Sequence, residues 1–323
     1  GAERSERRSD YMSDPRLRGA YLAFFLPQYA QKIALLLAQL EREGLCRLPD
    51  APRVLDVGAG PLTATLGVWL HRGALGPSAA LDLAGKAMAA GKAIVDDVAA
   101  GADVRLVEAP VAHRPLPAGP FDIVVVAHVL NELGDPRRAV PQRVALLRSL
   151  SSLLAPGGRL LVVEPGTRVH GRALMAVRDA LWDAGAPVLS PCRSAPACPL
   201  LRRPGDWCHG ELAWDRPPAF RALEEAAGLK KDLLKSSHLL LGPARDADVD
   251  PPRDGLRLVC RLMRDASDVE RRYGCGRAGL VVLRGDPRLP ERARAPLRGA
   301  LLDDERGIAV ETGVPRHGAR RRR

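Results

Sequence analysis

Short apolar runs alternate with longer, helix-like segments along the first half of the chain. The run at 121–126 is almost continuously apolar, which is typical of a strand buried on both faces of a sheet. Strands that alternate with helices at this spacing predict an α/β fold with a parallel, doubly wound sheet. We expect strands at 53–56, 78–83, 104–108, 121–128, 159–164, 238–241 and 257–262, and helices near 141–154 and 217–229.

The length of the chain limits how many domains it can form. A single hydrophobic core stops growing at roughly 250 to 300 residues, and this chain has 323 residues. We therefore expect one main domain with extensions. The expected parts are an N-terminal helical region at 1–50, an α/β domain at 51–265 with a cysteine-rich insertion at about 186–214, and a basic C-terminal extension at 266–323.

A glycine-rich turn follows the first expected strand. Its glycines let backbone N–H groups approach a ligand, and the next helix directs its positive dipole end toward that ligand. Thr63 stands where a dinucleotide fingerprint requires a third glycine, which argues against NAD. The acidic Asp56 before the glycines suits S-adenosylmethionine (SAM), whose sulfonium and amino groups are cationic. An ordinary strand–helix turn is the alternative interpretation.

The next expected strand ends in Asp82, where a carboxylate can accept both hydroxyl groups of a ribose. This second acid, one strand–helix unit after the glycine turn, strengthens the interpretation as a SAM site. The candidate cofactor-binding residues are Asp56, Gly58, Ala59, Gly60, Pro61, Thr63, Asp82 and His128.

Three cysteines, Cys192, Cys198 and Cys208, lie in a segment rich in proline and arginine. This segment has almost no apolar periodicity, so disulfides, a metal or disorder must account for it. A cytosolic, nucleotide-dependent domain disfavours disulfides, so a metal site is the preferred hypothesis and plain buried thiols are the next alternative. The spacing lacks the paired C-x2-C of a zinc ribbon, whereas an iron–sulfur cluster can span irregular loops and requires four thiolates.

Several short motifs together resemble one known family. They are GAGP in the glycine turn, NEL after the fourth strand, EPG after the fifth, and P-C-x5-C followed by D-W-C-H. This combination resembles the methyltransferase-like family of ribosomal small-subunit assembly proteins, within the class I SAM-dependent methyltransferases. The resemblance implies a class I Rossmann-like core, a four-cysteine [4Fe-4S] site and association with the small ribosomal subunit through its rRNA. Leu62 departs from the family, which has a small residue there.

The fourth thiolate of such a site is Cys260 or Cys275. Cys260 lies in an alternating, strand-like run where a cysteine is most simply a core residue. Cys275 lies between two glycines, which let the backbone wrap a ligand, and the family's last cysteine likewise precedes a glycine-containing turn. We therefore expect the metal ligands to be Cys192, Cys198, Cys208 and Cys275, with zinc as the alternative metal.

The residues after the fourth strand are the candidates for catalysis. His128 could act as a base, and Asn131 could hold an exocyclic amine of the methyl acceptor. Glu132 belongs to the same group of polar side chains. The alternative interpretation is that Asn131 and Glu132 cap the following helix.

The chain carries a formal net charge of +11, with 49 Lys and Arg against 38 Asp and Glu. This charge, and the arginine run at 320–323, predict a polyanionic partner such as small-subunit rRNA. A coding bias toward arginine would give the same charge without such a partner. No apolar run reaches the 18 residues of a membrane span, and no signal-peptide pattern is present, so we expect a cytoplasmic, ribosome-associated protein that is a monomer off the ribosome.

Three functional hypotheses follow. The first is a SAM-dependent methyltransferase acting on small-subunit rRNA. The second is a non-catalytic ribosome assembly factor that uses SAM and the cluster structurally. The third and weakest is a small-molecule methyltransferase with a zinc site. The sequence does not separate the first two, because both require an intact turn at Gly58 and Gly60.

Overall fold

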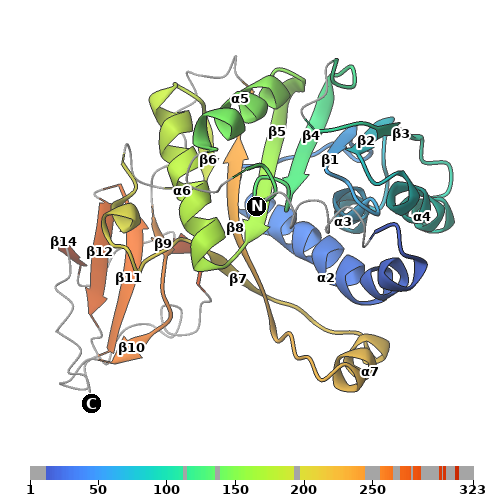
Figure 1. Ribbon diagram of the computed structural model, residues 1–323. Helices are drawn as coiled ribbons and strands as arrows, with labels where there is room; N and C mark the ends of the chain where they lie inside the picture. The colour runs from blue at the N-terminus through green and yellow to red at the C-terminus, as the bar shows by residue number, and fades with distance from the viewer. Residues whose placement is uncertain are drawn as a thin grey trace.

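The computed structural model places two β-sheets side by side, with helices on both faces of the larger one (Figure 1). The structure describes residues 12–111, 115–134, 139–192, 197–243, 255–264, 270–277, 279–284, 298–299, 301–302 and 310–312. The arginine run at 320–323 lies outside the described residues.

The larger sheet has the strand order β3-β2-β1-β4-β5-β8-β6, and β7 pairs with β8. The first five strands of this order are mutually parallel, whereas β8 runs antiparallel to both β5 and β6. The order reverses between β1 and β4, which is where open α/β sheets bind ligands. The strands are β1 (Val54–Val57), β2 (Ser78–Asp82), β3 (Val104–Glu108), β4 (Phe121–Ala127), β5 (Leu154–Pro165), β6 (Val188–Ser190), β7 (Gly210–Ala213) and β8 (Leu233–Leu241).

This topology confirms the expected α/β, Rossmann-like methyltransferase fold. The sheet is mixed, not wholly parallel as the sequence predicted, because β8 runs antiparallel to its neighbours. The strand expected at 257–262 does not join this sheet, and that expectation was wrong. The sheet instead gains β6, a strand of three residues between α6 and the first clustered cysteine. The strand is too short, and lies too close to prolines, for an apolar periodicity to indicate it in the sequence.

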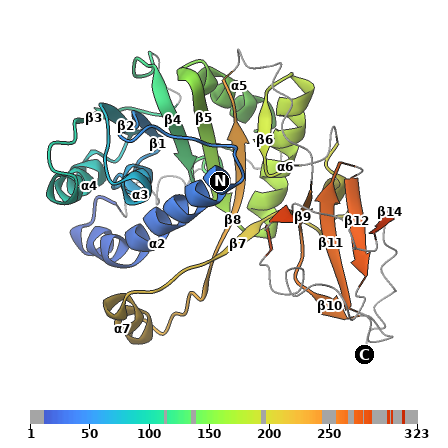
Figure 2. The same ribbon diagram turned by 180° about the vertical axis from the view of Figure 1, so that it is seen from behind.

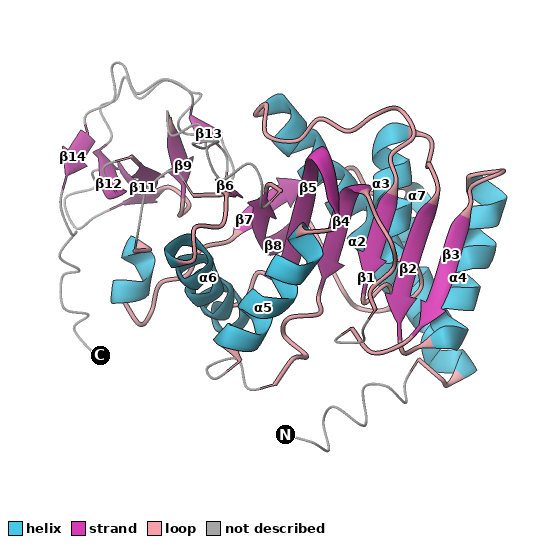
Figure 3. Cartoon of the chain, turned by 90° about the horizontal axis from the view of Figure 1, so that it is seen from above, coloured by secondary structure: helices cyan, strands magenta, loops and turns pink. Residues whose placement is uncertain are grey.

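Helices cover both faces of the larger sheet (Figure 3). On one face, α5 and α6 bury leucines and valines against alternate positions of β1, β4 and β5. On the other face, α2 and α3 pack against the intervening positions of the same strands. The helices are α2 (Pro15–Arg42), α3 (Thr63–Arg72), α4 (Gly85–Val98), α5 (Val140–Ser151), α6 (Arg168–Asp183) and α7 (Pro218–Ala226), with a 3-10 turn, η1, at Pro199–Arg202.

The long helix α2 confirms that the N-terminal region is helical, and it packs closely on α3. It begins after Asp14, whose side chain accepts the Arg16 N–H at 2.7 Å. The two helices meet at Gly67, where a Cβ atom would lie 2.6 Å from the Cβ of Ile33 and 2.8 Å from the carbonyl oxygen of Ala30. Only a glycine in α3 permits this approach.

The smaller sheet has the order β13-β9-β11-β12-β14, with β10 paired to β11, and its described pairings are antiparallel. It crosses the domain boundary expected at residue 265, because β9 on one side pairs with β11 on the other. The strands are β9 (Leu256–Leu258), β10 (Met263–Arg264), β11 (Glu270–Gly276), β12 (Gly279–Arg284), β13 (Leu301–Leu302) and β14 (Val310–Thr312). Among the described helices, none is long and apolar enough to cross a membrane.

Candidate functional site

The glycine turn joins β1 to α3 at the point where the strand order reverses. Gly58 has φ +69°, and a Cβ there would lie 2.1 Å from Cγ2 of Val129, so no larger residue fits. The N–H groups of Gly58 and Ala59 donate to the carbonyl of Leu81, at 2.7 and 3.2 Å. The Gly60 N–H donates to Oδ2 of Asp82 at 2.8 Å. These N–H groups therefore bind the end of β2 rather than face a ligand, and the glycines serve to keep the turn bare and close-packed.

Asp56 lies beneath this turn and is almost fully buried. Its Oδ2 accepts the N–H of Thr65 at 2.9 Å and the hydroxyl of Thr65 at 3.0 Å. Burial raises the pKa of Asp56 to about 6, although its hydrogen bonds with Thr65 act in the opposite direction. The structure thus places this carboxylate at the N-terminus of α3, where it caps the helix and favours its dipole.

Asp82 ends β2 and is half-buried beside the turn. Its Oδ1 accepts the Ala84 N–H at 2.8 Å, while Oδ2 accepts the Gly60 N–H. Each carboxylate oxygen has a further lone pair, so Asp82 can still accept the hydroxyl groups of a ribose. The remaining candidates, Ala59, Pro61 and Thr63, are buried and contribute the shape of the backbone.

His128 follows β4 in a left-handed conformation, with φ +61°. Its N–H donates to the carbonyl of Val163 at 2.8 Å, and its ring stacks on Tyr29 with centroids 4.7 Å apart. Tyr29 comes from α2 and was not among the residues expected from the sequence. The only sequence signal for Tyr29 is its position on the apolar face of a helix. That signal does not indicate that its ring contacts His128.

Asn131 lies three residues further along the chain, against a buried carboxylate. Its Nδ2 donates to Oε2 of Glu164 at 2.9 Å, and the Leu130 N–H donates to Oε1 at 2.9 Å. Burial raises the pKa of Glu164 to about 7. The N-cap residue of α5 is Ala139 rather than Asn131 or Glu132, which the alternative interpretation made the helix caps.

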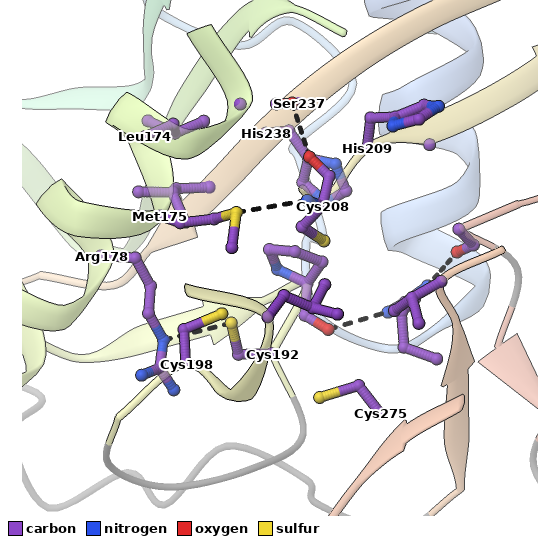
Figure 4. Close-up of a pocket in the computed structure, with 18 of the residues that line it drawn as sticks. Leu174, Met175, Arg178, Cys192, Cys198, Cys208, His209, Ser237, His238 and Cys275 are labelled. Atoms are coloured by element: carbon purple, nitrogen blue, oxygen red, sulfur yellow. Dashed lines mark hydrogen bonds between the residues drawn. The ribbon is translucent and has the colours of Figure 1, made fainter. Parts of the chain in front are cut away.

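A second site lies between the two sheets, where Cys192, Cys198, Cys208 and Cys275 line one pocket. The first three come from the segment between β6 and β7, and Cys275 comes from β11. Figure 4 shows their sulfur atoms around a common space. Cys260 is not part of this lining, and its sulfur accepts the Tyr273 N–H at 3.0 Å. The structure therefore brings together the four cysteines that the sequence selected.

Buried cations and backbone contacts surround this cysteine pocket. Arg178, on α6, donates from Nε to the Cys192 sulfur at 3.1 Å, and Arg257 also lines the pocket. Burial raises the pKa of Cys198 to about 12, with the nearby Cys192 contributing. The Ser237 hydroxyl donates a hydrogen bond of 2.7 Å to the Cys208 carbonyl. Sequence reasoning missed these supporting residues, since none belongs to a short motif.

All six cysteines lie in the described part of the chain, and none forms a disulfide. Within the described ranges, no three histidine, cysteine, aspartate or glutamate side chains are grouped closely enough to hold a single metal ion.

Comparison with known proteins gives several similarities. The chain is 32% identical over 112 residues to the ubiquinone/menaquinone biosynthesis C-methyltransferase UbiE of Azotobacter vinelandii, which covers 35% of this chain and 42% of that protein. It is 18% identical to the SAM-bound magnesium protoporphyrin IX methyltransferase of Synechocystis, with a TM-score of 0.42 over 66% of this chain and 79% of that one. A complex of the Haloferax volcanii Trm112 activator and a putative methyltransferase aligns at 15% identity, with a TM-score of 0.44 over 73% of this chain and 96% of that one.

The family comparison covers most of the larger sheet and α2. A profile described as mitochondrial small ribosomal subunit Rsm22 matches residues 19–228. This range contains the glycine turn, both acids beside it and three of the four pocket cysteines. The chain therefore belongs to the Rsm22 family of the small ribosomal subunit, whose methyltransferase-like fold it shares.

Proposed function

We propose that this protein binds SAM at the turn between β1 and α3 and transfers its methyl group to rRNA of the small ribosomal subunit. The observation that carries the proposal is the contact of Asp82 with the Gly60 N–H at the reversal of strand order. SAM is a nucleoside with a cationic tail. To bind here it needs a turn without bulky side chains and a carboxylate that can still accept hydrogen bonds from its ribose. Membership of a small-subunit family supports the choice of acceptor.

The chain's own residues would contribute mainly by positioning. Methyl transfer needs a nucleophile in line with the sulfonium methyl group, so much of the rate enhancement can come from alignment. The His128 ring is fixed by Tyr29 at the carboxyl end of β4, where it can accept a proton from the acceptor. The Glu164 carboxylate holds the Asn131 amide in a fixed orientation at the same edge.

We further propose that the cysteine pocket holds a [4Fe-4S] cluster. A [4Fe-4S] cluster is held by four cysteine thiolates, a set of side chains that this pocket offers. With four thiolate ligands the cluster carries a net negative charge. Arg178 on the pocket wall already donates to the Cys192 sulfur, so it places positive charge beside the proposed anionic cluster. When bound, the cluster would join the segment between β6 and β7 to β11, and so connect the two sheets. Zinc, the alternative metal and the one that would suit a small-molecule methyltransferase, fits less well, because no three ligating side chains of the described residues are close enough to hold a single ion.

A specific observation favours the second functional hypothesis, a non-catalytic assembly factor. The Asn131 amide, expected to hold an acceptor amine, is already engaged by Glu164. In that case SAM and the cluster would stabilise a surface that binds rRNA. The exposed Arg202, beside the pocket, belongs to this surface, and the ribosomal partner would place the protein in the compartment where ribosomes assemble.

Mapping of rRNA modifications tests the proposal. A strain that lacks the protein should lose one methyl group from small-subunit rRNA, and the wild-type gene should restore it. Asp82→Asn should fail to restore it, whereas Asp96→Asn, at an exposed ion pair on α4, should succeed. Defective subunits with every methyl group intact would instead establish the assembly role.

A further inference from the structure

Three aromatic side chains of α2 form a continuous row on one face of the helix. Tyr21, Phe25 and Tyr29 are spaced four residues apart, so they lie one above the other. Their ring centroids are 5.5 Å apart for the first pair and 5.9 Å for the second. All three are half-buried, whereas Phe24, beside them in the sequence, is buried. The chain has only four residues each of Trp, Tyr and Phe, so this row is a marked concentration of its aromatic surface.

The row leads to the place where the methyl acceptor must lie. Tyr29 stacks on His128, at an interplanar angle of 28°, and His128 directly follows β4. A left-handed conformation of a residue other than glycine is strained and persists only where the surroundings impose it. At His128 those surroundings include the Val163 carbonyl and the Tyr29 ring.

A buried cation accompanies the row. Lys32, one turn beyond Tyr29, is 4% exposed, and its ammonium lies 4.5 Å from the centre of the Tyr29 ring. Burial lowers the pKa of Lys32 to about 7, and the charge of Lys231 lowers it further. An ammonium has three N–H donors, and its contact with the face of the Tyr29 ring leaves donors that can reach an oxygen of a ligand.

Phe24, whose ring centroid lies 5.2 Å from that of Phe25, anchors the row to the rest of the molecule. Phe24 stacks on Phe220 of α7 at 5.4 Å, and Trp214 packs edge-on against Phe220 at 5.0 Å. In chain order α7 comes after β7 and before β8, and in space it lies beside the N-terminal half of α2 (Figures 1 and 2). Since β7 begins two residues after Cys208, the support of the aromatic row is continuous with the cysteine pocket.

We propose that Tyr21 and Phe25 form a stacking platform for unpaired bases of RNA, which guides the acceptor base to His128, with Lys32 donating to an oxygen of that nucleotide. Every nucleobase offers a π face, and aromatic platforms beside positive charge bind single strands in this way. The net charge of +11 matches a polyanionic strand. This inference rests on the proposed function, because it supplies the binding site for the rRNA acceptor.

Fluorescence anisotropy with a short, labelled, single-stranded RNA from the small subunit tests the platform. Phe25→Leu keeps an apolar side chain but removes the ring, and we expect it to weaken binding by about 5- to 150-fold. Phe25→Trp should bind as well as the wild type. Leu70→Ala, at an exposed leucine of α3, is the matched control and should change nothing. An abasic strand of the same length should bind Phe25→Leu and the wild type equally.

Two outcomes would overturn the inference. One is equal affinity of the wild type for the normal and the abasic strand, which would mean that phosphates alone are bound. The other is an unchanged affinity in Phe25→Leu. SAM binding by the same proteins, measured by calorimetry, separates this test from the proposed function. A wild type that binds no SAM but shows the full effect of Phe25→Leu would overturn the proposed function and uphold the platform.

Discussion

Glu43 and Arg257 form a buried, two-pronged ion pair, with both N–O distances 2.6 Å. Glu43 caps the end of α2, and Arg257 lies on β9 in the smaller sheet, 214 positions further along the chain. Arg257 also donates to the carbonyls of Pro191 and Gly299. One guanidinium thus connects the N-terminal helix, the segment that carries the pocket cysteines and the smaller sheet.

This connection predicts a strongly destabilising substitution. Arg257→Met should lower the free energy of unfolding by about 3–5 kcal/mol, because it leaves the Glu43 carboxylate buried without its partner. Arg221→Met removes an exposed ion pair with Asp215 and should cost at most about 1 kcal/mol. Urea unfolding of the two variants measures this difference. Similar losses of unfolding free energy in both would show that the buried ion pair contributes no more than the exposed one.

Asp56 should stabilise the start of α3 as a hydrogen-bond acceptor more than as a charge. Asp56→Ala leaves the Thr65 N–H without its acceptor in the core and should cost about 1–3 kcal/mol. Asp56→Asn can still offer an oxygen to that N–H, so its cost should be smaller. Thermal unfolding at neutral pH compares the two, and equal losses would contradict the capping role.

The same carboxyl group predicts a pH dependence. Its folded-state pKa, raised to about 6 mainly by burial, lies above the value of the unfolded chain. Between about pH 4 and pH 6 the folded state therefore binds more protons than the unfolded state. The wild type should gain stability relative to Asp56→Asn as the pH falls from 7 toward 5. A constant difference between the two proteins over this range would mean that Asp56 titrates normally.

The cysteine pocket predicts which thiols retain iron. Anaerobically purified wild type should be brown, with about four iron atoms per chain. Substitution of Cys192, Cys198, Cys208 or Cys275 by serine should remove the iron and reduce stability, because ligation energy contributes to folding energy. Cys260→Ser is the matched control, since Cys260 is outside the pocket lining. Colourless protein with one zinc, or loss of iron from Cys260→Ser alone, would refute the assignment.

Asp82 predicts a measurable loss of SAM affinity. Asp82→Asn should weaken binding by about 1–3 kcal/mol, because a charge-assisted contact with the ribose is lost. Asp82 also accepts the Gly60 N–H, so unfolding of the variant must be measured beside the calorimetry. Asp96→Asn on α4 serves as the control. Equal SAM affinity in all three proteins would remove Asp82 from the site, as would NAD binding in place of SAM.

The sequence predicted the elements whose neighbours are local. Most of the buried strands and the glycine turn follow from residues adjacent in the chain, and the structure contains them. Cys275, chosen over Cys260, lines the pocket with the other three cysteines, and its role as a ligand stays a prediction. The role of Asp56 did not follow, because the pattern showed an acid before two glycines but not which way its side chain turns. The direction toward Thr65 is visible only in three dimensions.

Partners that are distant in the chain were the least predictable. Tyr29 lies in a helix without a motif, and nothing in its neighbourhood indicates contact with His128. The apolar run around Arg257 fits either sheet, since alternation specifies a strand but not its neighbour. The pairing of β9 with β11 therefore could not be read from either segment alone.

The bare face of Gly67 sets where α2 lies, and Ala30 and Ile33 of that helix rest against it. A methyl group at position 67 would overlap the Ala30 carbonyl, and a backbone atom in a helix cannot yield alone, so α2 would be displaced as a whole. Tyr29 precedes Ala30 and would be carried away from His128. The absence of a side chain at position 67 therefore determines how α2 is aligned with the end of β4. A substitution there would misalign the methyl acceptor although the residue contacts neither SAM nor RNA.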